Sequence, residues 1–243
     1  MIEAAFWGIF SASSLLVGAG IALRWQVPTR LVGLVMGFGA GALISAVSFE
    51  LVEDAIEAAA GSGAAAAGLA AGAAAFFAGD WVIDRRGGAD RKDIQGKGSQ
   101  GNSAAIMLGT VLDGIPESIV VGGSLVLGGG VSTAMVAAAF ISNLPEALGA
   151  SVGLKAGGTP PGRLMAMWAA IVAISGLSAA VGYAVLDSAS ANVGAFFQAF
   201  AAGAVLTMLV DTMIPEAHEE AGKFAGLCTV LGFALAVWLS MSE

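Results

Sequence analysis

The sequence predicts an all-α integral membrane protein with eight transmembrane helices and both termini outside the cytoplasm. Composition indicates the fold class, because 57% of the 243 residues are hydrophobic and only 12% are charged. In a typical soluble domain about a quarter of the residues are charged. The placement of the basic residues between alternate apolar stretches then predicts the orientation.

Eight apolar stretches are each long enough to cross a bilayer, which takes about 20 residues. The first stretch follows Glu3, has no basic residue before it and is longer than the apolar region of a signal peptide, so we interpret it as a spanning helix. The short connections favour one transmembrane domain, residues 1–243, in a prokaryotic inner membrane. The predicted spans are 6–23, 31–52, 63–83, 104–127, 131–154, 163–186, 192–213 and 223–241.

All ten basic residues lie in or beside the odd-numbered connections between these stretches. Because positive residues are kept on the cytoplasmic side, these connections are predicted to be cytoplasmic and both termini periplasmic or extracellular. The longest connection, 85–103, is rich in glycine and charge and is predicted to be a flexible cytoplasmic loop with no role in nucleic-acid binding. The basic residues are Arg24, Arg30, Arg85, Arg86, Arg91, Lys92, Lys97, Lys155, Arg163 and Lys223.

A short internal repeat relates the second and seventh stretches. Residues 37–42 read Gly-Phe-Gly-Ala-Gly-Ala, and residues 199–204 read Ala-Phe-Ala-Ala-Gly-Ala. Because these two stretches have opposite parity, the copies would cross the membrane in opposite directions, which is a common trait of transporters. The match is short and low in complexity, so coincidence stays an alternative.

The acids near the middle of the fourth and fifth stretches are the residues that can carry chemistry. A charge at the centre of a span costs about 2.5–3.5 kcal/mol on insertion scales unless it is paired or hydrated. No Lys or Arg lies near the middle of any stretch, so a cation, protons or both must neutralise these acids. The two motifs are Asp113-Gly114-Ile115-Pro116-Glu117 and Ser142-Asn143-Leu144-Pro145-Glu146.

Four oxygen-bearing side chains can converge where these two helices meet. Asp113 and Glu117 are four residues apart and share a helix face, as do Asn143 and Glu146 at three apart. Each proline lacks a backbone donor and is expected to break the helix, which frees a carbonyl one turn earlier. We predict that these four residues bind a divalent metal ion, which is a transported substrate and not a cofactor. Protonated acids that only pack helices together are the alternative.

On these motifs the chain resembles the ZIP (Zrt/Irt-like protein) family of metal transporters, whose fourth and fifth helices carry the same proline-glutamate steps. The residues that match are Pro116, Glu117, Pro145 and Glu146. The resemblance implies a 3+2+3 helix arrangement with inverted outer triplets and a variable loop after the third helix. It also implies inward movement of Zn, Mn, Fe or a similar cation. The first, fourth, fifth and sixth helices would move against the other four, and we also expect a homodimer.

Three positions depart from the family pattern. Asp113 stands where the family usually has histidine, Gly114 where it has asparagine, and Ser142 where it often has histidine or glutamine. Imidazole suits zinc, whereas an oxygen-only ligand shell suits harder cations such as Mn or Mg, with Fe(II) intermediate. The ligand types therefore weaken the expectation of zinc selectivity.

Further polar residues are candidates for lining the route of the ion. A negative opening would concentrate cations, although ordinary solvation of helix ends is an alternative for each residue. They are Glu50, Glu53 and Asp54 near the outer end of the second span, Asp211, Glu216 and His218 near the inner end of the seventh, and Ser142 beside the predicted site.

Three other classes of function can be weighed against transport of a divalent metal. Enzymatic activity is not expected, because the spans hold no histidine pair, cysteine cluster or Ser/His dyad. A membrane protein that binds metal as a sensor but no longer conducts it stays open. A transporter of the same fold that carries protons or another cation also stays open.

Overall fold

The computed structural model describes residues 1–88, 103–127 and 130–242, and in these ranges every regular element is helical. The all-α prediction is therefore confirmed. Most of the connection 85–103, with Arg91, Lys92 and Lys97, lies outside the described residues. The α-helices are α1 (Ile2–Arg24), α2 (Thr29–Ala46), α3 (Glu53–Ala59), α4 (Ala64–Ile83), α5 (Ser103–Leu127), α6 (Thr133–Ala156), α7 (Pro161–Ser188), α8 (Ala191–Met208), α9 (Ile214–Ala221) and α10 (Phe224–Ser240).

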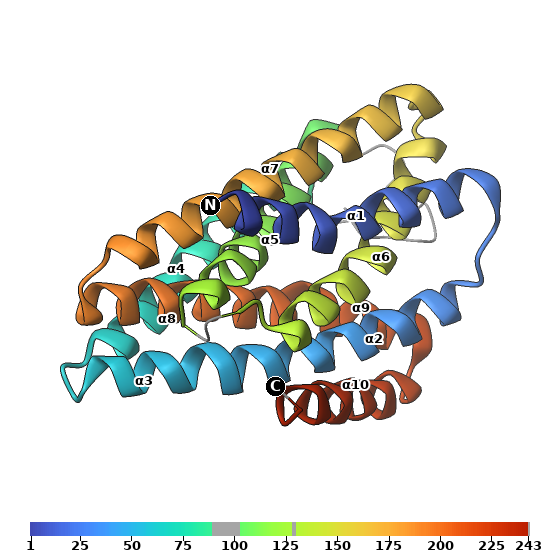
Figure 1. Cartoon of the computed structure of the whole chain (residues 1–243). Helices are drawn as coiled ribbons and strands as arrows, with labels where there is room; N and C mark the ends of the chain where they lie inside the picture. The colour runs from blue at the N-terminus through green and yellow to red at the C-terminus, as the bar shows by residue number, and fades with distance from the viewer. Residues whose placement is uncertain (89–102, 128–129, 243) are drawn as a thin grey trace.

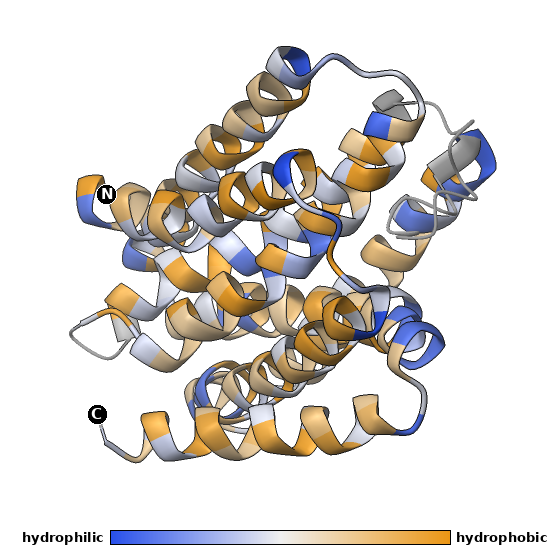
Figure 2. Ribbon diagram, turned by 90° about the vertical axis from the view of Figure 1, so that its right-hand side faces the viewer, coloured by the Kyte–Doolittle hydropathy of each residue, from blue (hydrophilic) through white to orange (hydrophobic). Residues whose placement is uncertain are grey.

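Seven helical rods in the described ranges are long and apolar enough to cross a membrane. The eighth predicted span, α10, is apolar but has only 17 residues, which is the lower limit for a spanning helix. Figure 2 shows hydrophilic residues mainly at the helix ends, with a few inside the bundle. The lengths and hydropathy of the helices are thus those of a membrane-embedded protein.

Two of the rods are longer than the hydropathy predicted. The second is a continuous helix over Thr29–Ala59 and the seventh over Ala191–Ala221, so each helix continues beyond the predicted span, 31–52 or 192–213. In each rod a π-helical segment, Val47–Val52 or Leu209–Met213, joins the apolar part to a short helix with several acids. The apolar pattern ends where the acids begin, but the helical backbone does not.

The helices form two groups, each held together by extensive contacts. In the first group α1 packs on α6 and α7, and α5 packs on α7. In the second group α4 packs on α8, and α10 packs on α2. The two groups meet mainly where α6 contacts α2 and α5 contacts α8, so that α5 and α6 lie between α1 and α7 on one side and α2 and α8 on the other (Figure 1).

Two helix pairs in the second group cross so closely that the crossing requires glycine. The carbonyl oxygen of Thr229 on α10 occupies the space that a Cβ atom would need at Gly41 of α2. The carbonyl oxygen of Leu69 on α4 occupies the same space at Gly203 of α8. The reciprocal contacts are Gly232 against Phe38 and Gly72 against Phe200. Small residues that permit such approach are typical of helix packing in membranes.

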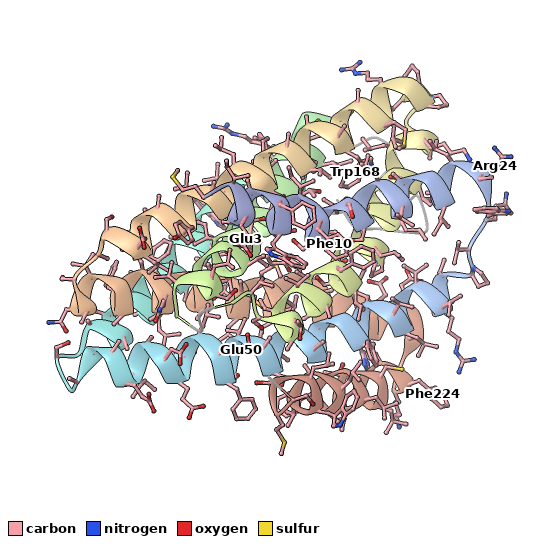
Figure 3. All side chains as sticks on the ribbon, in the orientation of Figure 1. Glu3, Phe10, Arg24, Glu50, Trp168 and Phe224 are labelled. Atoms are coloured by element: carbon pink, nitrogen blue, oxygen red, sulfur yellow. The ribbon has the colours of Figure 1, made fainter. Side chains whose placement is uncertain are left out.

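Basic side chains bind several helix ends together at one end of the bundle. Lys155 Nζ, at the end of α6, donates hydrogen bonds of 3.3 Å to the carbonyl oxygens of Ala22 and Leu23 at the end of α1. The guanidinium carbon of Arg30 lies 5.0 Å from the centre of the Phe224 ring. Arg24 and Phe224 lie at this same end in Figure 3. Positive charge therefore gathers where α1, α2, α6 and α10 begin or end.

Replacing Trp168 with Phe is expected to destabilise the first group by about 1–2 kcal/mol. The indole Nε1 of Trp168 donates a 2.8 Å hydrogen bond to Ser151 Oγ, and both residues are buried. The measurement is the thermal unfolding temperature of the purified protein in detergent. The control is Trp238→Phe, since Trp238 is 64% exposed on α10. Equal shifts for both variants would contradict the assigned role of the hydrogen bond.

Candidate metal site

The two proline-glutamate motifs lie on neighbouring central helices, α5 and α6. Contrary to the prediction of broken helices, α5 and α6 each continue as one α-helix through Pro116 and Pro145. The neighbouring turns hold the backbone in a helical path although proline supplies no donor. The polar side chains of both motifs are buried: Asp113 is 1% exposed, Glu117 3%, Ser142 0%, Asn143 5% and Glu146 3%.

The side chains of Ser142 and Glu117 join the two motifs directly. Ser142 Oγ of α6 lies 3.5 Å from Glu117 Oε1 of α5. This distance is too long for a strong hydrogen bond, and the hydroxyl also donates to the carbonyl oxygen of Ala139 at 3.0 Å. The contact still places the Glu117 carboxylate of α5 against the first residue of the α6 motif. Ser142 thus lies next to Glu117, and its place on the route of the ion stays a prediction.

Glycines on α1 and α2 allow the backbones of these two helices to approach the α6 motif closely. A Cβ atom at Gly39 of α2 would lie 2.9 Å from Ser142 Cα. A Cβ atom at Gly18 of α1 would collide with the carbonyl oxygen of Leu144. Both α1, of the first group, and α2, of the second group, therefore pack closely on α6 at the level of the motif. Movement between the groups would change the contact between α2 and α6.

The acids that were predicted to converge do not form a metal-binding cluster in the described part of the chain. Within the described ranges, no three His, Cys, Asp or Glu side chains lie close enough together to hold a metal ion. Asp113, Glu117 and Glu146 are thus all buried on adjoining helices but are not gathered around one point. Their role as metal ligands, together with that of Asn143, stays a prediction.

A cavity of about 580 Å³ begins close to the α5 motif. It is lined by the π-segment Val47–Val52 and α3, by the second half of α5, by residues 130–132 before α6, and by parts of α7 and α8. Ile119 and Val120 belong to its wall. They follow Glu117 by two and three residues, which is about 3–5 Å along the helix axis. The cavity thus approaches a buried carboxylate of the predicted site.

The acids and the histidine predicted along the route fall into three sets. Glu50 and Asp54 are partly buried and line the cavity, and Figure 3 shows Glu50 well away from the Arg24 end of the bundle. Glu216 is also partly buried but is not part of the cavity wall. The remaining three, Glu53, Asp211 and His218, are exposed, so the structure does not bring them to the site.

Gln198, a buried polar residue of the cavity, was not predicted from the sequence. Gln198 of α8 lines the cavity and is 4% exposed. The available signal was an amide in the middle of an apolar stretch, where polar residues are rare and usually functional.

Comparison with known proteins leaves the resemblance to the ZIP family as an expectation. No protein-family model matches the chain, and no curated protein sequence matches it. Function must therefore be argued from the buried carboxylates, the cavity and the arrangement of the helices.

Proposed function

We propose that the protein is a secondary transporter that moves divalent metal cations across the membrane towards the cytoplasm. The observation that carries the proposal is the set of three carboxylates, Asp113, Glu117 and Glu146, each no more than 3% exposed on two neighbouring helices of apolar spans. No Lys or Arg lies in residues 106–126 or 133–154 to neutralise them. This concentration of negative charge would attract and bind a cation that passes between these helices.

The donor set favours a hard cation. The motif offers carboxylate oxygens, the Asn143 amide and the Ser142 hydroxyl, with no imidazole or thiolate. Oxygen ligands suit Mn and Mg, whereas nitrogen and sulfur ligands suit zinc and the later transition metals. Mn²⁺ is therefore the first ion to test, with Fe²⁺ and Zn²⁺ as competitors. Proton exchange at the same acids would offset their charge when no metal is bound.

The helix arrangement supports alternating access through an inverted repeat. The shift of 162 residues that aligns residue 37 with residue 199 also aligns residue 47 with residue 209, where the two π-segments begin. The same shift aligns Gly41 with Gly203, which make equivalent close contacts with α10 and α4. Two matched halves of this kind are the usual basis for movement around a central site. The group of α1, α5, α6 and α7 would move against the rest.

The basic end of the bundle is proposed to face the cytoplasm, and this orientation can be tested with two cysteines. In a Cys228→Ser chain, Ser190→Cys in the α7–α8 connection is expected to react with an impermeant maleimide in intact cells. Thr159→Cys in the α6–α7 connection is expected to react only after the membrane is opened. These expectations follow from the positive-inside rule. The reverse labelling pattern would overturn the orientation.

Counting bound metal and measuring flux on the same preparation test the proposed function. Elemental analysis of the purified protein should find a divalent metal, and the protein in liposomes should take up Mn²⁺ without ATP. Bound metal without uptake would indicate a sensor, and uptake of protons alone would indicate another substrate. Either result would overturn the proposal.

A further inference from the structure

The cavity beside the α5 motif has a polar wall of its own, made by helices of the second group. Glu50 and Asp54 from the second rod line it together with Gln198 of α8. The remaining wall is largely apolar and includes Phe49, Val181 and Phe197. Glu117, Asn143 and Glu146 do not belong to the wall. The polar wall is therefore separate from the predicted transport site.

Gln198 is the unusual member of this wall. Its side chain is 4% exposed, and its Oε1 atom is buried without a hydrogen-bond partner in the part of the chain that the structure describes. An unsatisfied buried acceptor costs about 1–3 kcal/mol. The two serines of the wall differ, because Ser124 Oγ donates to the carbonyl oxygen of Val121 at 2.9 Å and Ser132 Oγ accepts from the amide of Met135 at 3.0 Å. The Gln198 oxygen therefore calls for a further donor or cation.

We infer that Glu50, Asp54 and Gln198 form an outer loading site that holds a hydrated divalent cation before it reaches the α5 and α6 motifs. The inference rests on the proposed function and names the step that precedes the central site. Six waters occupy about 180 Å³ at about 30 Å³ each, so a hexahydrated ion fits a cavity of about 580 Å³. The ion need not lose its waters there.

The chemistry of the wall selects a cation over other occupants. Two carboxylates and an amide oxygen are all acceptors of hydrogen bonds from metal-bound water. No Lys or Arg side chain lines the cavity among the described residues, so an anion finds no partner. Mg²⁺ and Mn²⁺ often keep several waters in protein sites and are held by one or two carboxylates. A loading site built in this way concentrates the ion without binding it tightly.

The test measures Mn²⁺ binding to the full-length Glu117→Gln/Glu146→Gln variant, in which the central site is disabled. Electron paramagnetic resonance of Mn²⁺ is expected to show weak binding with a signal typical of a hydrated ion. Adding Glu50→Gln and Gln198→Met should weaken this binding at least about tenfold. The matched controls are Glu53→Gln, an exposed acid on the same rod, and Gln26→Met, an exposed amide at the other end of the bundle. Neither control should change the binding.

Two results would overturn the loading site. One is no Mn²⁺ binding by the double variant although it is monodisperse and unfolds at the temperature of the parent protein. The other is binding that persists unchanged after Glu50→Gln and Gln198→Met are added. Transport by the unmodified protein would survive either result, so the proposed function and the loading site fail separately. In the otherwise unmodified chain, Gln198→Met should raise the KM for Mn²⁺ uptake at least about threefold with little change in kcat.

Discussion

Replacing Glu117 or Glu146 with Ala is expected to reduce Mn²⁺ uptake at least about tenfold. Each side chain is 3% exposed on a central helix, and each supplies negative charge in a span that holds no Lys or Arg. Loss of even a group that supports a metal ligand costs about 10- to 100-fold in metal affinity or activity. The measurement is the initial rate of Mn²⁺ uptake by the purified variants in liposomes at matched protein content.

The matched control for these variants is Glu53→Ala. Glu53 is an acid of the second rod, but it is exposed and does not line the cavity. Uptake should stay within about twofold of the parent rate, because an exposed charge is screened by solvent and salt. Undiminished uptake in both Glu117→Ala and Glu146→Ala would contradict the assignment of the transport site.

Replacing Gly232 with Ala is expected to destabilise the pairing of α2 and α10 by about 1–3 kcal/mol or more. The carbonyl oxygen of Phe38 occupies the space that the new Cβ atom would need. Backbone cannot move aside as a flexible side chain can, so α10 must shift away from α2. The measurement is the thermal unfolding temperature in detergent, which should fall by several degrees.

Gly226 of the same helix supplies the control. A Cβ atom at Gly226 would meet no atom within 4 Å, so Gly226→Ala adds no clash. Alanine also favours helix over glycine by up to about 1 kcal/mol. The unfolding temperature should therefore stay the same or rise. A fall for Gly226→Ala as large as that for Gly232→Ala would show that close packing at Phe38 is not the cause.

The sequence predicted those features that follow from local chemistry. Apolar length located the helical rods, and the acids of the fourth and fifth spans are indeed buried on adjoining helices. One local prediction failed. The helices were expected to break at Pro116 and Pro145, but α5 and α6 continue through both residues.

Other features required the assembled structure. The cavity is lined by segments from five parts of the chain, and no sequence pattern shows that they meet. Gln198 is an amide inside an apolar stretch, but its place in the cavity wall with Glu50 is known only from the structure. The pairing of Gly41 with Thr229 likewise joins residues that are far apart in the chain.

Uptake of Mn²⁺ by the unmodified protein in sealed liposomes tests the central claim most directly. An indicator trapped inside the vesicles reports entry of the ion, and vesicles that contain the Glu117→Gln/Glu146→Gln variant give the background. The account predicts saturable uptake by the unmodified protein, without ATP, and a rate near that of empty vesicles for the variant. Equal rates for the unmodified protein, the variant and empty vesicles would contradict it.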